Sequence, residues 1–542
     1  MTGELDWLDD DGGMLGSVVG GSLSRGLDVR LTASNAVEKA KVGTFVTMEG
    51  ADRRFFGIVT DLSLDSADPR LRAAAGDTDP AVASVLSGTS AFAIASVTPI
   101  LSTSVGGEGH EPARSLPAHF APVRRASNED VQAVFGSEDD RHIYIGSPLD
   151  MEDARVCLDL HELVKRSNGV FGKSGSGKSF LTRILLAGIV QRNAATNLVF
   201  DMHNEYGWQG TSEGGYTAKG LKQLFPSRVA VFTLDERSSR QRGVATDFEV
   251  RIGFDEIEPE DVAILAPTLG ITELGVQACY GLRRRFGKGW VRDFVRQDAR
   301  AATELADELR ESQSTLDALR RRLSQLDRLD FVTDASTGGG SVRQVLEHLS
   351  AGKHVVLEFG RHGNDLAAYL LVANLLTRRI HAEYRRRTEE ALSAGSPLPK
   401  PLVITIEEAH RFLSREVATQ TIFGTIAREM RKYRVTLLVV DQRPSGIDEE
   451  VLSQIGTRIT CQLDNERDVD AVLTGGPGSR ELKGVLSRLE PSQQALMFGH
   501  ALPMPVVVRT REYGPAFYEE MASASGGGSA TEPERDRRDL FG

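Results

Sequence analysis

A glycine-rich octapeptide supplies groups that could bind the phosphates of a nucleotide. Residues 172–179 read Gly-Lys-Ser-Gly-Ser-Gly-Lys-Ser and fit the phosphate-loop pattern G-x-x-x-x-G-K-[ST] at every fixed position. Glycines let successive backbone N–H groups face the phosphates, and the start of the following helix adds a partial positive charge. Lys178 would reach the β- and γ-phosphates, and the Ser179 hydroxyl would bind Mg²⁺. We expect a nucleoside triphosphate and Mg²⁺ to be held by Gly172, Lys173, Ser174, Gly175, Ser176, Gly177, Lys178, Ser179 and Phe180.

Two adjacent carboxylates follow a second apolar run. Residues 402–406 have the composition of a buried strand, and Glu407 and Glu408 come directly after it. The carboxyl ends of the strands are where ligands of open α/β folds bind. Glu407 occupies the position of a magnesium-associated acid, and Glu408 is the expected general base. An acidic N-cap for a helix that starts at Ala409 is a second interpretation, and both can hold at once.

Further polar groups could act on the γ-phosphate. The apolar run 435–440 places Gln442 near a strand tip, where it could sense the γ-phosphate or merely end the strand. The segment 426–433 has helical character and would place Arg428 and Arg431 on one face. An arginine supplied by a neighbouring subunit would stabilise the charge on the transferred phosphoryl group. Sequence alone does not separate that role from surface salt bridging.

The elements that must position these residues alternate between strands and helices. An apolar strand end precedes the phosphate loop, and residues 180–187 after it have helical spacing. Further buried-type strands are expected at 197–200, 229–232, 354–359, 402–406 and 435–440, the first ending in Asp201. Alternation of this kind is typical of a parallel sheet. We therefore predict an α/β protein with a RecA-like phosphate-loop core.

Other regions differ in character. Short strands separated by turns at about 14–100 indicate a small β-barrel, interrupted near 66–90, and residues 103–117 have the composition of a linker. Leucines at heptad-like spacing between 305 and 326 indicate an inserted helical bundle. The expected segments are an acidic tail at 1–12, a barrel at 13–120, the first core part at 121–256, the helical bundle at 257–349, the second core part with C-terminal strands at 350–521 and a disordered tail at 522–542.

Composition limits the class of protein. The chain has 542 residues, 40% of them hydrophobic and 26% charged, and a net charge of -12, so any nucleic-acid contact should be confined to a local basic region. The three cysteines are widely separated and form no zinc or disulfide pattern. The sequence has no apolar run long enough to span a membrane and no basic segment typical of a secretory leader at its start. A cytoplasmic protein without membrane contact is expected.

Three ordered motifs support a family resemblance. The phosphate loop, EEAH at 407–410 and DQRPS at 441–445 make the chain resemble the HerA family of hexameric DNA-translocating ATPases, whose wider relatives include FtsK-type DNA pumps. The resemblance covers nearly the whole chain. The N-terminal strands resemble the HerA/ATP-synthase barrel, the core resembles the RecA-type domain, and residues 257–349 resemble its helical insertion.

The resemblance implies further roles. Arg166 and Asp201 fall where the family has active-site residues, and Glu205 belongs to the same motif as Asp201. For the arginine finger, Arg431 is a closer local match than Arg428. Glu407 stands where the general motif has an aspartate. Family members form rings around duplex DNA and work with a nuclease, commonly NurA, that docks through the barrel face.

The expected function is therefore an ATP-driven translocase or helicase for double-stranded DNA. It would form a homohexamer and serve a NurA-like nuclease in DNA end resection and double-strand break repair. An ATP-gated scaffold, or the ATPase subunit of an anti-phage nuclease complex, is the alternative, because it would use the same active-site residues. Candidate DNA contacts on predicted loops are Arg237, Arg240, Arg242 and Arg361. Solvated turns are the more ordinary interpretation for each of these loops.

Overall fold

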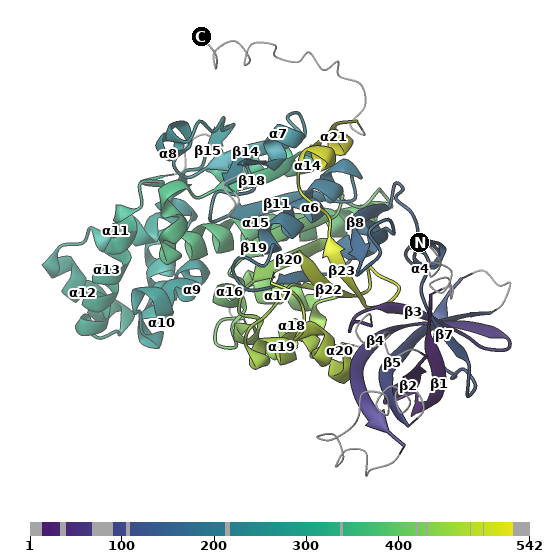
Figure 1. Cartoon of the computed structure of the whole chain (residues 1–542). Helices are drawn as coiled ribbons and strands as arrows, with labels where there is room; N and C mark the ends of the chain where they lie inside the picture. Colours follow the sequence, from purple (N-terminus) through teal and green to yellow (C-terminus); the bar gives the residue numbers. More distant parts are fainter. Residues whose placement is uncertain are drawn as a thin grey trace, which may run out of the picture.

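The protein consists of a β-barrel beside a larger α/β core, from which a group of helices projects on the other side (Figure 1). The computed structural model describes residues 13–32, 40–67, 90–104, 109–211, 217–335, 340–418, 421–429, 432–476, 479–491 and 493–523. The tail at 1–12, most of the interruption at 66–90 and the segment 524–542 lie outside these ranges, so their predicted character stays a prediction.

The barrel is formed by antiparallel strands that close on themselves. Their order is β2-β1-β7-β3-β4-β5-β6, and an additional pairing of β2 with β5 joins the two sides. Alternate side chains such as Val29, Val46 and Val97 are fully buried inside, as expected for strands with one face toward a core. The strands are β1 (Met14–Ser22), β2 (Gly26–Leu31), β3 (Phe45–Glu49), β4 (Arg53–Ser66), β5 (Ala91–Ser104), β6 (Glu111–Pro112) and β7 (Pro122–Arg125).

The predicted linker at 103–117 is wrong in part. Strand β5 continues to Ser104, and β6 pairs with it through Leu101 opposite Pro112 and Ser102 opposite Glu111. The chain then returns through β7 between β1 and β3. The described part of this segment therefore belongs to the barrel and is not a connection that leaves it.

The core is one mixed sheet with the order β15-β14-β18-β11-β19-β20-β10-β21-β22-β23-β8-β9. The pairings from β15 to β21 are parallel, and those from β21 to β9 are antiparallel. The predicted parallel sheet is thus confirmed. Its strands are β8 (His142–Pro148), β9 (Val156–Asp159), β10 (Asn168–Phe171), β11 (Thr196–Asp201), β14 (Val229–Thr233), β15 (Phe248–Glu249), β18 (His354–Glu358), β19 (Leu402–Glu407), β20 (Val435–Asp441), β21 (Thr457–Thr460), β22 (Gln494–Gly499) and β23 (Val506–Thr510).

The position of the phosphate-loop strand follows from its apolar neighbours. Strand β10 lies between β20 and β21, with Phe171 beside Asp441 on one side and Thr460 on the other. Each of these strands is buried along its whole length, which matches the continuous apolar runs of a sheet covered on both faces. The carboxyl ends of β11, β19, β20 and β10 therefore meet at one edge of the sheet.

The two ends of the helical insertion lie side by side. The short strands β16 (Ile252–Gly253) and β17 (Val332–Thr333) pair in parallel at its base. Leu305, Leu316, Leu319, Leu323 and Leu326 are buried between its helices, so the predicted helical bundle is confirmed. The helices are α9 (Pro259–Leu269), α10 (Glu273–Phe286), α11 (Trp290–Val295), α12 (Ala299–Leu309) and α13 (Gln313–Leu323), with 3₁₀ turns η1 (Phe254–Glu256), η2 (Gly287–Gly289) and η3 (Ser324–Arg328).

The remaining helices pack on the core or connect its strands. The longest is α15 (Leu366–Ala394), which contacts α9 and α17. The others are α4 (Asn128–Phe135), α5 (Leu160–Val164), α6 (Lys178–Gln191), α7 (Leu221–Leu224), α8 (Glu236–Gln241), α14 (Gly340–Ser350), α16 (His410–Leu413), α17 (Ile422–Glu429), α18 (Glu449–Gln454), α19 (Glu466–Leu473), α20 (Ser479–Leu486) and α21 (Pro515–Ser523). A small hairpin is formed by β12 (Gln209–Thr211) and β13 (Thr217–Lys219), and two 3₁₀ turns are η4 (Gly360–Asn364) and η5 (Pro444–Gly446).

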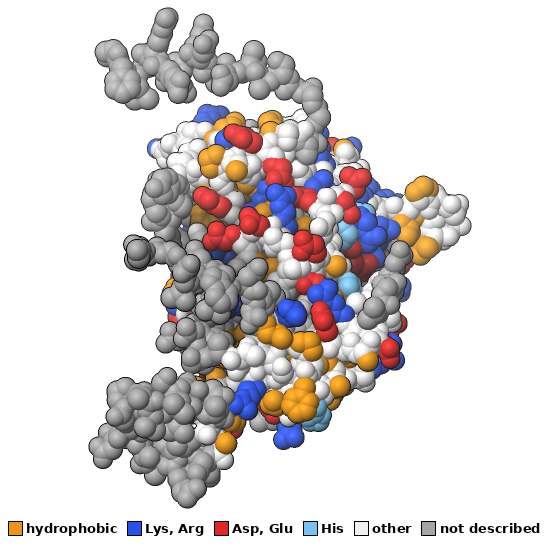
Figure 2. All heavy atoms as spheres, turned by 45° about the vertical axis from the view of Figure 1, so that its right-hand side comes forward, with side chains coloured by type: hydrophobic (Ala, Val, Ile, Leu, Met, Phe, Trp, Pro, Cys, Tyr) orange, Lys and Arg blue, Asp and Glu red, His pale blue; other side chains and the backbone are white. Residues whose placement is uncertain are grey.

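The surface carries charges of both signs. On the face drawn in Figure 2, Lys and Arg side chains are interspersed with Asp and Glu side chains and do not form one continuous basic track. Within the part of the chain that the structure describes, no helix is both long and apolar enough to cross a bilayer.

Candidate ATP-hydrolysis site

The phosphate loop connects the end of β10 to the start of α6. Gly177 caps the helix with a φ of 91°, and Gly175 has a φ of 75°, a region that favours glycine. A Cβ on Gly172 would lie 2.6 Å from Ser176 Oγ and 2.8 Å from Cys461 Cβ. The glycines are thus required by the tight path of the chain, while Ser174 and Gly175 remain exposed at its tip.

Bonds to two neighbouring strand ends hold the loop in place. The Gly172 N–H donates to the Asp441 carbonyl (3.2 Å), and the Lys173 N–H donates to the Gln462 carbonyl (2.9 Å). The Lys173 ammonium pairs with Asp464 (2.9 Å), so this side chain is turned toward the segment after β21. Ser176 Oγ donates to the Lys173 carbonyl (2.8 Å) and closes the turn.

The segment after β11 forms a compact loop around one carboxylate. Asp201 is fully buried and accepts hydrogen bonds from the N–H groups of Glu205 (2.8 Å), Tyr206 (2.7 Å) and Gly207 (3.1 Å). Arg183 on α6 donates to the Glu205 carbonyl (2.7 Å). These contacts fix the loop 201–207 against the helix that carries the phosphate loop. Asp201 therefore shapes the backbone of the site.

Arg183 is itself buried among aromatic rings. Its guanidinium lies 5.1 Å from the ring centre of Phe180, 5.9 Å from that of Tyr206 and 5.8 Å from that of Tyr513. Planar guanidinium groups stack favourably on such faces. Phe180, which we expected beside the nucleotide, thus packs against Arg183 and Tyr513.

Glu407 is a buried acid held by two tyrosines. The Tyr206 hydroxyl donates to Glu407 Oε1 (3.0 Å), and the Tyr369 hydroxyl bonds both the carbonyl (2.9 Å) and the N–H (3.1 Å) of Glu407. Burial, together with the charges of Asp201 and Glu205, raises the pKa of Glu407 to about 8, against the lowering effects of the Tyr206 hydrogen bond and the Lys178 charge. Glu407 and the phosphate loop lie at the same edge of the sheet, because Phe171 pairs with Asp441 and Glu407 pairs with Val440 in adjacent parallel strands.

Asp201 and Glu358 end adjacent parallel strands and repel each other. Burial and the charge of Glu358 raise the pKa of Asp201 to about 7, against the effect of its three N–H donors. Burial also raises the pKa of Glu358, which Arg242 opposes through an ion pair of 2.6 Å. The site therefore concentrates carboxyl groups in a region of low dielectric constant.

Glu408 lies beside Gln442 at the ends of two adjacent strands. Gln442 Nε2 donates to Glu408 Oε1 (3.2 Å). Glu408 itself has a φ of 47°, an uncommon conformation for a residue other than glycine. The structure thus brings together the tips of β19 and β20, which the sequence predicted only as separate motifs.

The residues present fit a magnesium ion that is completed by the nucleotide. Glu407 Oε2 is buried and has no hydrogen-bond partner, and Ser179 lies in the first turn of α6. In the described residues no group of three or more His, Cys, Asp and Glu side chains forms a metal cage. Mg²⁺ bound with a nucleotide needs only a few protein ligands, because phosphate and water oxygens supply the others.

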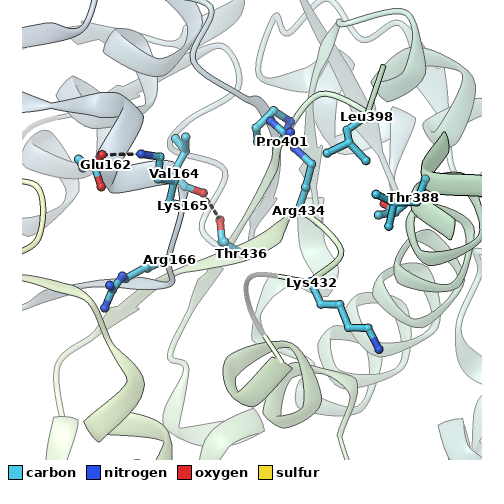
Figure 3. A pocket seen from close by; sticks show the side chains of 11 residues that line it. Glu162, Val164, Lys165, Arg166, Thr388, Leu398, Pro401, Lys432, Arg434 and Thr436 are labelled. Atoms are coloured by element: carbon cyan, nitrogen blue, oxygen red, sulfur yellow. Dashed lines mark hydrogen bonds and ion pairs between the residues drawn. The ribbon is translucent and has the colours of Figure 1, made fainter. Parts of the chain in front are cut away.

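The arginines proposed to act on phosphate lie elsewhere. The amino ends of β10, β19 and β20 surround a cavity of about 530 Å³, lined by Arg166, Lys165, Lys432 and Arg434 together with apolar side chains (Figure 3). Arg166 also contacts His500, and Arg428 pairs with Glu450 at 3.5 Å. Among the described residues, neither Arg166 nor Arg428 has a hydrogen bond or ion pair with the phosphate loop or with Glu407 and Glu408.

The expected helix at 426–433 is shorter than predicted. Helix α17 ends at Glu429, so Lys432 and Tyr433 lie beyond it. Arg431 is outside the described residues. The proposed shared face of Arg428 and Arg431 thus remains a prediction.

The four candidate DNA contacts have different surroundings. Residues 236–241 form helix α8 instead of the predicted loop, with Arg237 exposed and Arg240 paired with Glu236. Arg242 is occupied by the buried Glu358. Arg361 pairs with Asp235 (3.3 Å) and Asp330. Arg242 thus has a structural contact that speaks against a free DNA-binding side chain.

Several residues of the site were not identified from the sequence. Tyr206 donates to the Glu407 carboxylate, and Tyr369 bonds to the Glu407 backbone. Arg183 donates to the Glu205 carbonyl, and Glu358 ends the strand beside Asp201. Glu358 ends a buried strand exactly as Asp201 does, so the rule used for Asp201 could have found it. Tyr369 and Arg183 lie on helices whose apolar spacing gives no signal of a polar contact.

Comparison with known proteins places this geometry in a family. Residues 143–380 match the family model described as "Helicase HerA, central domain", and residues 15–93 match the HAS barrel domain. Among solved structures, the bacterial conjugative coupling protein TrwB aligns with a TM-score of 0.47 at 13% identity, covering 72% of this chain and 92% of that chain. VirB4 of Thermoanaerobacter pseudethanolicus aligns with a TM-score of 0.43 at 13% identity, covering 70% and 99%.

Curated relatives extend the match. A DNA double-strand break repair helicase HerA of Pyrococcus furiosus is 27% identical over 71% of this chain and 72% of its own length. The protein of the same name from Sulfurisphaera tokodaii is 26% identical over 92% of this chain and 93% of its own length. With both family models matched in order and a complete phosphate loop, the chain is an ATPase in which a HAS barrel domain is followed by a HerA helicase central domain.

Proposed function

We propose that this ATPase works as a ring that moves double-stranded DNA and feeds a nuclease during DNA end resection and double-strand break repair. The observation that carries the proposal is the meeting of the phosphate loop, Glu407 and the Glu408–Gln442 pair at one sheet edge. The names of the relatives, DNA double-strand break repair helicases, support the DNA substrate.

Each residue of the site has a role in hydrolysis. Lys178 binds the β- and γ-phosphates, and the glycine-rich loop offers its N–H groups to them. Ser179 and Glu407 hold Mg²⁺, which neutralises developing phosphate charge when it is bound. Glu408 accepts a proton from the attacking water, and Gln442 orients the carboxylate of Glu408 and senses the γ-phosphate. Asp201 acts through the backbone of the loop 201–207.

A neighbouring subunit completes the site. Phosphoryl transfer requires cations around the charge that develops on the γ-phosphate, and an arginine supplied in trans is one solution. Arg166 lies at the amino ends of the strands, at the edge of the sheet opposite the phosphate loop. In a head-to-tail ring two different faces of the subunit meet at each interface, so the edge that carries Arg166 would be able to face the nucleotide edge of the next copy. We therefore assign Arg166 and one of Arg428 and Arg431 to the site of the adjacent subunit in a homohexamer.

DNA and the nuclease bind at other parts of the ring. Repeated weak contacts to phosphates would grip duplex DNA without reading its sequence. Arg237, which is exposed, is the first candidate contact, whereas Arg242 and Arg361 would have to leave their carboxylate partners to reach DNA. The barrel would dock a NurA-like nuclease.

The test is steady-state ATP hydrolysis with and without linear duplex DNA at several salt concentrations. A motor that holds phosphates should be stimulated by DNA, and the stimulation should fade as salt rises. The Lys178→Ala protein serves as the blank. Hydrolysis that is indifferent to DNA, with and without a candidate nuclease, would contradict translocation and favour an ATP-gated scaffold in a nuclease complex.

A further inference from the structure

We propose that Asp441 and His410 form a positioning pair that holds the general base Glu408 in its working orientation. The inference rests on the role of Glu408 proposed above and adds two residues to which no role had been given. It is based on three features: the backbone of Glu408, the contacts of Asp441, and the place of the His410 ring.

The backbone at Glu408 needs support from its surroundings. A residue other than glycine in the left-handed region costs on the order of 1–3 kcal/mol and persists only where neighbouring contacts enforce it. Glu408 has a φ of 47° immediately after the buried Glu407. The chain direction changes at this point, because α16 begins two residues later at His410. Contacts at His410 therefore help to fix the conformation of Glu408.

Asp441 supplies those contacts from the adjacent strand. Its carboxylate is buried and accepts the His410 backbone N–H (2.7 Å), the His410 Nδ1–H (3.0 Å) and the Arg443 N–H (2.6 Å). One side chain thus connects the loop after β19 to the loop after β20. Its backbone carbonyl also accepts the Gly172 N–H of the phosphate loop. Asp441 lies where three loops of the site meet.

The ring of His410 lies beside the base itself. His410 Nδ1 is 3.8 Å from Glu408 Oε2, while Gln442 donates to Oε1 on the other side of the carboxylate. The Glu408 carboxylate is therefore flanked by the His410 ring, which Asp441 holds, and by Gln442, which follows Asp441 in the chain. Gly446 permits the close packing, because a Cβ there would lie 3.1 Å from His410 Cβ. The geometry favours one carboxylate orientation over the alternatives.

An isosteric variant tests the pair. Asp441→Asn keeps an oxygen for the backbone donors but cannot hold the His410 ring as a carboxylate does. We expect kcat to fall by ~10–100-fold, the size typical when a group that orients a functional residue is lost. KM and the affinity for ATP should change by less than about 3-fold, since the phosphate loop is intact. His410→Ala should also lower kcat. This variant tests the pair if Asp441→Asn yields little folded protein.

Asp468 provides the matched control. It is also buried and holds the loop after β20, accepting the Ser445 N–H (2.9 Å), but the structure gives it no contact with His410 or Glu408. Asp468→Asn should leave kcat nearly unchanged. An equal loss of kcat in Asp441→Asn and Asp468→Asn would show that general loosening of this loop is the cause and would overturn the proposal.

A double-mutant cycle separates this inference from the function on which it rests. If Asp441 acts through Glu408, Asp441→Asn should lower the residual rate of the Glu408→Gln protein only slightly. If Asp441→Asn lowered kcat by the same factor in the Glu408→Gln protein as in the native protein, the positioning role would be overturned. Full turnover in Glu408→Gln alone would instead remove Glu408 as the base, which refutes the proposed site and not merely its positioning pair.

Discussion

Buried carboxyl groups dominate the electrostatics of single residues in this site. Asp201, Glu358 and Glu407 lie at or next to the ends of β11, β18 and β19, and burial raises the pKa of each. Only Arg242 forms an ion pair with any of these three among the described residues. A bound cation would reduce the repulsion, because charge of opposite sign favours the ionised acids. The nucleotide-free protein is therefore under electrostatic strain at neutral pH.

The first prediction concerns the pH dependence of stability. The pKa of Glu407 is about 8 in the folded protein and near its ordinary value of 4.5 in the unfolded chain. Between these values the folded state binds more protons, so the free energy of unfolding falls as pH rises from about 4.5 to 8. Glu407→Gln removes this contribution, which amounts to a few kcal/mol because one pKa unit corresponds to about 1.4 kcal/mol.

Thermal unfolding of the nucleotide-free protein at pH 6 and pH 8.5 measures this effect. The gain in Tm of Glu407→Gln over the native protein should be larger at pH 8.5. Glu450→Gln, whose carboxylate is 69% exposed, should show no such pH dependence. An equal change in Tm at both pH values would contradict the raised pKa of Glu407.

The second prediction separates binding from chemistry. Lys178→Ala should abolish ATP turnover, because the loop loses the cation that reaches the β- and γ-phosphates. Glu408→Gln should bind ATP and hydrolyse it at least ~100-fold more slowly, since general-base catalysis contributes about 10²–10⁴-fold. Retention of labelled ATP after rapid gel filtration distinguishes the two variants. Normal turnover in both would refute the site assignment.

At the scale of elements, the strands of the core were predictable because burial on both faces produces continuous apolar runs. Each predicted run corresponds to a strand within one or two residues, and polar residues mark the ends of β11, β19 and β20. C-terminal strands were expected, but their antiparallel pairing, which extends the sheet through β22 and β23 to β8 and β9, was not predicted. Strand order depends on pairings between distant segments, which local periodicity does not record.

The candidate site was predictable only where a motif names its residues. The phosphate loop, Glu407, Glu408 and Gln442 were found from local patterns, and the structure brings the last two into contact. The contribution of Arg183 could not be predicted, because in sequence it is one polar residue in an apolar helix. Its function depends on the loop 201–207 and on Tyr513, which are distant along the chain.

The third prediction tests how α6 supports that loop. Arg183→Met retains apolar volume but leaves the Glu205 carbonyl without its donor, which costs about 1–3 kcal/mol for a buried group. We expect lower stability in urea unfolding and a reduced kcat, because Tyr206 and Glu407 lose part of their support. Arg285→Met, which removes an exposed ion pair with Glu308, is the control and should change stability little.

A result in which both variants unfold at the same urea concentration as the native protein would contradict this role. Loss of stability without any change in kcat would limit Arg183 to holding the fold. The two measurements thus distinguish support of the helix from support of the catalytic loop.

At the scale of the whole molecule, the barrel is joined to the core by apolar packing. Phe45 and Phe56 of the barrel belong to the same buried cluster as Phe135 on α4, and the rings of Phe45 and Phe135 lie 5.9 Å apart. Exposed pairs such as Arg488–Asp61 (3.3 Å) add little to stability. The shared apolar cluster couples the two parts, so a protein docked on the barrel would be held at a defined position relative to the core.

The fourth prediction tests whether sites are shared between subunits. Lys178→Ala and Arg166→Ala proteins should each be nearly inactive alone. In rings assembled from equal amounts of both, some interfaces combine the intact Lys178 of one subunit with the intact Arg166 of its neighbour. Roughly a quarter of the interfaces would then be complete in a head-to-tail ring with random assembly. Co-expression with two different tags, purification through both and measurement of ATP hydrolysis would detect the restored activity.

The pairing of Lys178→Ala with Glu408→Gln is the decisive control. Lys178 and Glu408 lie at the carboxyl edge of the same sheet, so a complete site needs both residues from one subunit. Each subunit in this mixture lacks one of the two, and therefore no interface is complete. Activity should therefore return with Arg166→Ala and not with Glu408→Gln. Arg428→Ala in the same design tests the second arginine. If no arginine variant restores activity although mixed rings form, catalysis in trans is refuted, and the cavity at the amino ends of the strands must serve another purpose.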